Sequence, residues 1–266
     1  MKIDLYTRAW NDAHMLGFFF RHYDPYVRTY WIFDDGSTDA TLDILKAHPR
    51  VRLGRFDNVD PDSRILSARA FFDDCWKQSR GDADWVILTD IDEHLYHADL
   101  AGYLEACGRA GITLIPALGY QMLSETFPDP DLHLASALTR GQPWDKMSKL
   151  NIFAPAAIDE VRYSPGRHRA QPEGRLLLPP RDELLLLHYK YLDFDQVHAR
   201  HELAATRSRT TDIARRYGHK YFWSREQLRE DWDKVKAGCI DVAAPDLNPH
   251  DSHDASRWWK DYPRAD

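Results

Sequence analysis

The sequence has 266 residues, of which 43% are hydrophobic and 12% aromatic, so it can bury the core of one large domain, or of a domain with an extension. Its formal net charge of −7 argues against a nucleic-acid-binding protein, which usually carries a basic surface. The three cysteines are widely spaced and form no Cys-x-x-Cys pattern, which disfavours a zinc site or a disulfide framework.

The first 117 residues alternate between two kinds of hydrophobic pattern. Apolar, partly β-branched runs predict strands at 2–6, 27–33, 51–56, 85–90 and 112–117. Helical spacing with capping residues predicts helices from Asn11 or Asp12 to about Tyr23, then at 40–47, 63–79 and 99–110. This order implies βαβ units and a mostly parallel sheet flanked by helices, an α/β fold.

After about residue 118 the regular alternation of predicted strands and helices ends. Strands are predicted at 119–123, 149–153, 160–163 and 183–189. The Pro-, Asp- and Gly-rich segment 124–146 is expected to be a long loop, a candidate mobile lid, and 164–182 is expected to be mostly turn. From Asp193 onward the apolar spacing is helical, and the tail from Ala243 is expected to be irregular and held by its tryptophans.

The chain carries no sign of a targeting or membrane segment. The first four residues, Met1 to Asp4, already include an acid, and no apolar segment follows them. A signal peptide would have such an apolar segment. No run approaches the roughly 18 apolar residues that a membrane span needs. Together with the cysteine pattern, this predicts a cytoplasmic protein without a membrane span.

Two acidic turns follow predicted strands and therefore belong at the same edge of the sheet, where ligands of parallel α/β sheets bind. The first is Asp34-Asp35-Gly36-Ser37-Thr38-Asp39. A carboxylate there, Asp35 with Asp34, could accept the N3–H of uracil or pair with a ribose hydroxyl. An ordinary strand-to-helix turn with a capping Ser or Thr is an equal alternative.

The second acidic turn is Asp90-Ile91-Asp92-Glu93, directly after an apolar strand. In an extended chain Asp90 and Asp92 lie on the same side. Because unpaired buried charge is costly, a cation held by these carboxylates would remove that cost. Mg²⁺ or Mn²⁺ on Asp92, with Asp90 nearby, could bridge a diphosphate. A solvated acidic turn is the alternative.

Histidines and basic residues later in the chain could complete such a site. His188 ends an apolar strand, and it or His168 could bind a Mn²⁺-type ion or phosphate, or act as a base; simple hydrogen bonding at a strand end is the alternative. Lys149 opens a strand and could neutralise phosphate, whereas Arg207 lies on a predicted helix, where an arginine more often belongs to a solvated face. Glu125 and Asp145, in the candidate lid, are candidate general bases.

These motifs in this order resemble a family-2-type glycosyltransferase of the GT-A fold, and most of all the bacterial branch with an Asp-x-Asp-Glu motif that is similar to the family-92 group. The resemblance spans roughly residues 1–225. It rests on the segments 34–39, 85–93, 119–122, 148–153, 164–168 and 187–192. Two positions depart from the pattern: Arg167 stands where a cysteine is expected, and His94 where a phenylalanine is usual.

The resemblance implies a GT-A (Rossmann-like) nucleotide-sugar-binding and catalytic domain over 1–192, with a helical C-terminal extension, 193–266, packed on it. It implies a donor that is a nucleotide-diphosphate sugar, UDP-linked by preference, and an Mn²⁺ or Mg²⁺ cofactor. The expected acceptor is a glycan, a lipid-linked molecule or a small molecule, whose hydroxyl would attack the anomeric carbon of the donor sugar with inversion and displace the nucleotide diphosphate.

The resemblance also implies roles for single residues. Asp35 with Asp34 would contact base and ribose, Asp92 and His188 would bind the metal or diphosphate, and Asp90 would assist through metal or ribose. The remaining donor-pocket residues are Thr7, Lys149, His168 and Arg207. The catalytic base does not align, so Glu125 and Asp145 both stay open.

Three other activities remain possible from the residues. A nucleotidyltransferase would need a Gly-rich phosphate loop after the first strand, where the sequence reads Thr7-Arg8-Ala9-Trp10-Asn11. A phosphohydrolase would use Asp90 as its nucleophile. A non-catalytic nucleotide-binding or scaffold domain would bind a nucleotide diphosphate and transfer nothing.

Overall fold

The computed structural model describes residues 1–253 and 257–266. The elements of the first half are, in chain order, β1 (Ile3–Ala9), α1 (Ala13–Tyr23), β2 (Thr29–Asp34), α2 (Thr41–Ala47), β3 (Val51–Arg55), α3 (Arg64–Asp74), η1 (Cys75–Ser79), β4 (Trp85–Leu88), β5 (Glu93–Tyr96), α4 (Leu100–Arg109) and β6 (Leu114–Ser124). The predicted helix at 63–79 is thus α3 followed by a short 3₁₀ turn.

In the described part of the chain, the second half adds further strands and, after residue 192, four α-helices. Its elements are α5 (Leu134–Ala137), β7 (Arg140–Pro143), η2 (Asp145–Met147), β8 (Lys149–Phe153), β9 (Ile158–Glu160), η3 (Pro165–Arg167), β10 (Glu173–Gly174), β11 (Leu185–Leu192), α6 (Phe194–Ala205), α7 (Thr210–Ala214), η4 (His219–Phe222), α8 (Arg225–Ala237), β12 (Ile240–Asp241) and α9 (Pro249–Ser252).

One large sheet organises the molecule, with the strand order β12-β7-β6-β8-β4-β1-β2-β3 and β11 paired to β6 and β5. The pairs β4-β1, β1-β2 and β2-β3 are parallel, as βαβ units require, whereas β8 runs antiparallel between β4 and β6. Helices pack on this sheet in one core that includes Phe19, Phe72 and Leu104. The predicted mixed α/β fold, with a parallel central sheet flanked by helices, is confirmed.

Two expectations about the middle of the chain were wrong. The predicted strands at 112–117 and 119–123 form one strand, β6, which pairs with β8 on both sides of a register shift at Ile115–Pro116 and with β11 and β7 further on. The expected loop 124–146 contains α5 and β7, and β7 pairs with β6. Since Leu134 is buried in the core, this segment is anchored rather than free.

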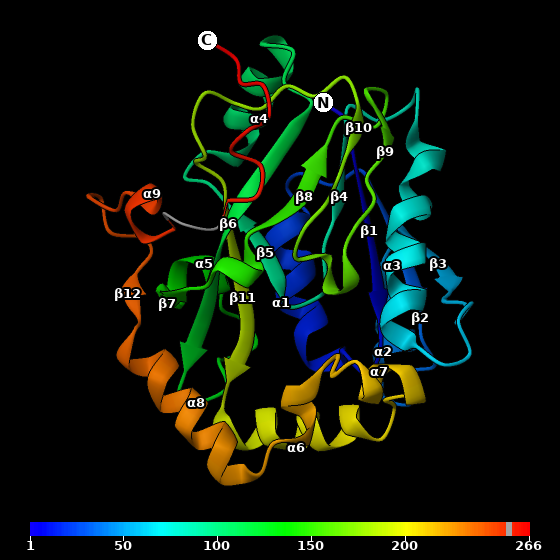
Figure 1. The fold of residues 1–266 in the computed structure, drawn as a ribbon, viewed down its shortest axis with the longest axis vertical. Helices are drawn as coiled ribbons and strands as arrows, with labels where there is room; N and C mark the ends of the chain where they lie inside the picture. Colours follow the sequence, from blue (N-terminus) through cyan, green and yellow to red (C-terminus); the bar gives the residue numbers. More distant parts are fainter. Residues whose placement is uncertain (254–256) are drawn as a thin grey trace.

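Helices α6 and α8 lie at the carboxyl ends of β6 and β11, and α7 lies beside the start of α3 (Figure 1). The predicted apolar spacing explains this packing, because Phe194 and Val197 of α6 meet Leu228, Trp232 and Val235 of α8 in a second core. The tail is held as expected at Trp259, which is fully buried and donates to Asp182 at 3.0 Å. Residues 254–256 of the predicted irregular tail lie outside the described residues.

His94, which stands where the resemblance leads one to expect phenylalanine, is fully buried behind the acidic turn. Its ring stacks on His22 with centroids 4.4 Å apart. Neither of its ring nitrogens has a hydrogen-bond partner among the described residues. Buried polar atoms without partners destabilise the folded state, so this position carries a cost that an apolar ring would not have.

We therefore expect His94→Phe to raise the free energy of unfolding at pH 8 by about 1 kcal/mol, since it removes two unpartnered nitrogens at the risk of slight crowding. Urea unfolding followed by circular dichroism measures this change. His94→Gln is the matched control and should not stabilise, because its amide is equally unpartnered. A destabilised His94→Phe variant would show that the nitrogens have partners in solution.

Candidate active site

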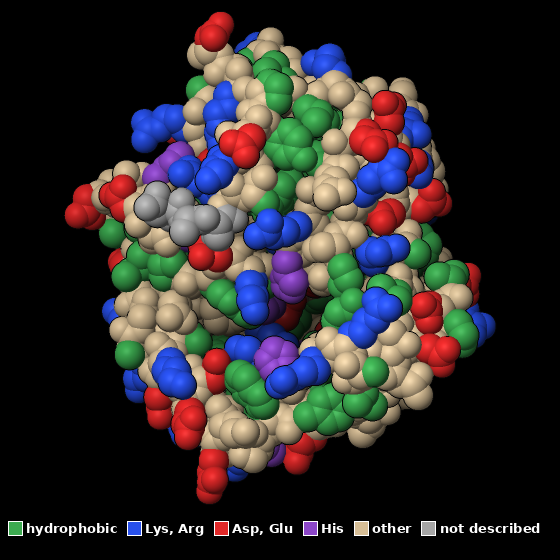
Figure 2. Space-filling view, viewed as in Figure 1, with side chains coloured by type: hydrophobic (Ala, Val, Ile, Leu, Met, Phe, Trp, Pro, Cys, Tyr) green, Lys and Arg blue, Asp and Glu red, His purple; other side chains and the backbone are tan. Residues whose placement is uncertain are grey.

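A cavity of about 600 Å³ lies beyond the carboxyl ends of β1 and β4 and is closed on one side by α6. Figure 2 shows the molecule hollowed above α6, with Lys, Arg and His side chains around the opening. Five of the sequence-predicted site residues line it together: Asp35, Asp90, Asp92, His188 and Arg207. Its volume lies in the range of small-molecule sites. The two acidic turns, more than 50 residues apart in the chain, thus meet as expected at one edge of the sheet.

Asp92 and His188 face each other in the cavity, with Asp92 Oδ2 3.4 Å from His188 Nε2. Gln121 sets the orientation of the histidine: its amide nitrogen donates to the carbonyls of Met122 and His188, so its oxygen accepts the Nδ1–H of His188 at 2.8 Å. A neutral ring held in this way points the lone pair of Nε2 at a carboxylate. Only a proton or a cation between the two atoms satisfies both.

Electrostatics agree that Asp92 is ionised. Burial by itself raises the pKa of this carboxyl, but the positive charge and hydrogen bond of a His188 that carries a proton on Nε2 outweigh it and hold the pKa at about 2. A metal cation in the place of that proton would lower the pKa in the same direction. A charged carboxylate and an oriented imidazole nitrogen are suitable ligands for Mn²⁺.

Asp90 is differently placed, because Arg167 reaches it from η3. The Arg167 guanidinium donates to Asp90 at 2.8 Å, to Glu93 at 3.2 Å and to the carbonyl of Leu88 at 2.9 Å. Lys149 pairs with Glu93 at 2.5 Å from the other side. Burial raises the pKa of Glu93, but Lys149 and Arg167 together hold it at about 2. Of the three carboxylates, Asp92 alone has no Arg or Lys partner among the described residues.

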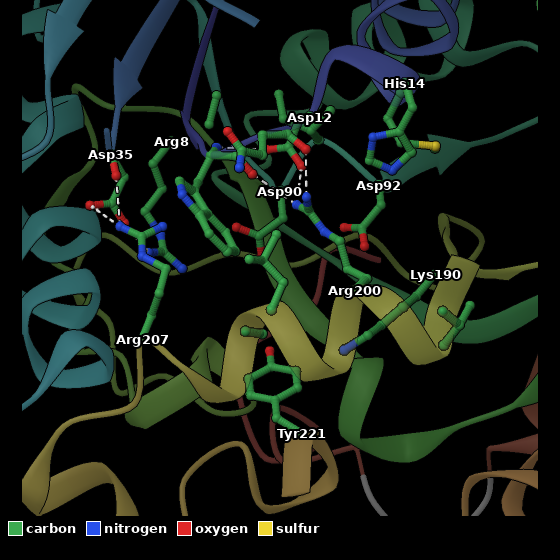
Figure 3. Close-up of a pocket in the computed structure, with 18 of the residues that line it drawn as sticks. Arg8, Asp12, His14, Asp35, Asp90, Asp92, Lys190, Arg200, Arg207 and Tyr221 are labelled. Carbon is green, nitrogen blue, oxygen red and sulfur yellow. Dashed lines mark hydrogen bonds and ion pairs between the residues drawn. The ribbon is translucent and has the colours of Figure 1, made fainter. Parts of the chain in front are cut away.

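At the other end of the cavity, three arginines surround Asp35. Arg207 lies 3.2 Å and Arg8 3.6 Å from its carboxylate, and Arg64 forms a third ion pair (Figure 3). Asn58 also donates to it, at 3.3 Å. Burial, followed by repulsion among the arginines, lowers the pKa of Arg64 to about 9 and that of Arg207 to about 10.

Asp12, predicted from the sequence only as a helix cap, also lines the cavity. Its side chain makes no cap bond to α1; it accepts from Arg200 and from the Trp10 backbone N–H at 2.9 Å instead. Burial raises its pKa to about 6, against the opposing effect of Arg200. The signal that could have found it is its position, since an acid directly after β1 lies at the same edge as the acids after β4.

Six other predicted residues are not among the described residues that line this cavity. Thr7 is buried inside β1, and its hydroxyl donates to the carbonyl of Arg8. Asp34 accepts the backbone N–H groups of Gly36 and Ser37 within its own turn. The capping Ser or Thr of the alternative is not observed, because α2 has Ala40 at its N-cap and no side-chain cap bond. Glu125 is exposed and pairs with Lys236, and Asp145 is exposed in η2.

Lys149 and His168 are the remaining two. The Lys149 ammonium is committed to buried Glu93, so it serves the interior rather than the cavity. His168 donates from Nδ1 to the carbonyl of Lys146 at 2.6 Å. Whether any of the six contacts a ligand stays a prediction.

No cluster of three or more His, Cys, Asp or Glu side chains that could hold a metal by itself occurs in residues 1–253 and 257–266. Asp92 and His188 therefore make at most a two-ligand site. Mg²⁺-type ions bound with substrate phosphates commonly use only one or two protein ligands, so the residues present fit such an ion. Within the same ranges, no helix is both long and apolar enough to cross a membrane.

No family model and no curated protein matches the sequence. Among solved structures, glucosyl-3-phosphoglycerate synthase from Mycobacterium tuberculosis, in complex with Mn²⁺, UDP and glucosyl-3-phosphoglycerate, is 19% identical over 44% of each chain, with a TM-score of 0.31. S. aureus TarS in complex with UDP-GlcNAc is 10% identical over 77% of this chain and 66% of that one, with a TM-score of 0.37.

This chain thus spans less than half the length of the first of these proteins. Likenesses with TM-scores of 0.31 and 0.37 decide neither fold nor function, so the fold class stands on the sheet topology itself.

Proposed function

We propose that this protein is a metal-dependent glycosyltransferase of the GT-A type that moves a sugar from a nucleotide-diphosphate sugar, UDP-linked by preference, to an acceptor hydroxyl with inversion. The observation that carries the proposal is the Asp92–His188 pair: a carboxylate and an oriented imidazole lone pair lie 3.4 Å apart in a cavity at the carboxyl edge of the sheet. This pair matches a divalent cation that also binds a diphosphate.

The chain's own residues have distinct tasks in this proposal. A bound cation would stabilise the negative charge that develops on the departing diphosphate. Asp92 and His188 would hold that cation, Gln121 keeps the ring in its tautomer, and Arg167 fixes the position of Asp90. Lys190 and Arg200 line the same cavity and add positive charge for the phosphates.

We propose Asp12 as the group that takes the proton from the acceptor hydroxyl. It lies in the cavity, whereas Glu125 and Asp145 do not line it. Burial raises its pKa to about 6, which makes it a stronger base than an ordinary carboxylate while leaving it largely ionised near pH 7.

The competing enzyme activities find less support in the geometry. Asp90, the nucleophile of the phosphohydrolase alternative, is held by the buried guanidinium of Arg167 at 2.8 Å and is thereby a weaker nucleophile. A non-catalytic nucleotide-binding domain would use the same cavity and differs only in releasing no UDP from a UDP-sugar.

UDP should raise the unfolding temperature only when Mn²⁺ is present. At a UDP concentration a hundredfold above Kd, the free energy of unfolding should increase by about 2.7 kcal/mol. Asp92→Asn should lose this gain, because it keeps the shape of the side chain and removes the charge that holds the cation. Thermal unfolding with Mn²⁺, UDP, both or neither measures it. Asp145→Asn, exposed and outside the cavity, should behave as wild type. Equal stabilisation of the Asp92→Asn variant would contradict the proposed cation site.

Asp12→Asn should lower kcat for UDP release from a UDP-sugar by about 10²- to 10⁴-fold, the usual contribution of a general base, and leave Mn²⁺–UDP binding nearly unchanged. Initial rates of UDP release, with water or an added sugar as acceptor, provide the measurement. Glu125→Gln is the matched control and should keep wild-type kcat. If Glu125→Gln were impaired and Asp12→Asn were not, the base would have to be reassigned.

A further inference from the structure

The arginine cluster is defined as Arg8, Arg64 and Arg207, which line the cavity and all pair with Asp35. Figure 3 shows Arg8, Arg207 and Asp35 at the end of the cavity remote from Asp92. The members of the cluster come from β1, from the start of α3 and from the segment after α6. Their side chains are 27%, 15% and 21% exposed, whereas the Asp35 carboxylate behind them is only 4% exposed. What this end presents to a ligand is therefore mainly guanidinium N–H donors.

The positive charge at this end is incompletely balanced. Asp35 is one carboxylate shared by three arginines. Asp34 and Asp212 lie nearby, but Asp34 accepts the N–H groups of its own turn and Asp212 accepts from Ser63 and the Arg64 backbone N–H. Arg209 adds a further positive charge, directed at the carbonyls of Asp60 and Pro61.

A structural role alone leaves part of the arginine cluster unexplained. Within the described residues, the Nε of Arg8 is buried and has no hydrogen-bond partner. Burial and mutual repulsion also depress the pKa values of Arg64 and Arg207, so their charged forms are held at a cost. An anion with several acceptor oxygens would supply the missing acceptor and reduce the repulsion.

We propose that the arginine cluster is a metal-independent anion subsite that takes a phosphate-type group of a substrate, with Asp35 orienting the guanidinium groups rather than reading a base. Oδ1 of Asp35 faces Arg207 and accepts from Asn58, and Oδ2, which has no hydrogen-bond partner among the described residues, faces Arg8 and Arg64. With its side chain only 4% exposed behind three guanidinium groups, this carboxylate has little surface left for a base N–H. The phosphate belongs either to the donor itself or to a second, acidic substrate, which is the acceptor if the chain transfers sugars.

Inorganic phosphate tests the subsite without any assay of sugar transfer. Titration calorimetry at constant ionic strength, with EDTA present, should detect phosphate binding to the wild-type protein. Arg207→Gln and Arg8→Gln should each weaken it by about tenfold, the loss expected when one charge-assisted hydrogen bond is removed. Arg215→Gln removes an exposed arginine of the same segment that is outside the cavity and should leave binding unchanged.

Competition identifies where the phosphate comes from. Displacement by UDP with Mn²⁺ would assign it to the donor, and simultaneous binding of UDP–Mn²⁺ and phosphate would assign it to the second substrate. Displacement by uridine, which has the base and no phosphate, would overturn the proposal in favour of base reading by Asp35. Absence of binding with EDTA, or an equal loss in Arg215→Gln, would also overturn it. None of these outcomes depends on whether the protein transfers sugars.

Discussion

The compensation of the clustered negative charge after β4 determines what this cavity can bind. Asp90, Asp92 and Glu93 follow one strand within four residues; Glu93 is buried, whereas the Asp90 and Asp92 side chains are 36% and 31% exposed. Carboxylates this close together repel one another and need positive charge beside them, the buried one most of all. Glu93 receives Lys149 and Arg167, and Asp90 receives Arg167. Among the described residues, Asp92 receives no lysine or arginine, and its partner is His188, which Gln121 holds through Nδ1. The negative charge of Asp92 is therefore available to a cation that enters with a ligand.

The two ends of the cavity carry charges of opposite sign. One end carries the acids of the β1 and β4 turns with His188, and the other end presents the arginines around Asp35. The segment after β11 makes this division possible, because α6 and the residues that follow it bring Arg200 and Arg207 across the carboxyl edge of the sheet. Asp212 then ties α7 to the start of α3 through Ser63. A substrate with two separated acidic groups fits this distribution of charge, one group bound through a cation and one bound directly.

The sequence predicted the parallel half of the sheet well, because alternating apolar strands and capped helices are local patterns. It also predicted that Asp35, Asp90, Asp92 and His188 would meet, since topology brings the carboxyl ends of such strands together. The charge partners could not be predicted in this way. Arg167 lies 77 residues from Asp90, and Lys149 lies 56 residues from Glu93, so only the folded chain reveals these pairs. Asp12 was missed because an acid before a helix is usually a cap.

The most direct test of the cation site is a crystal structure of the protein with UDP and Mn²⁺, with the metal located by its anomalous scattering. The account predicts one manganese peak in contact with both Asp92 and Nε2 of His188, with the diphosphate completing its ligands. A manganese ion bound elsewhere in the cavity, or UDP bound there with no metal at Asp92, would contradict the account.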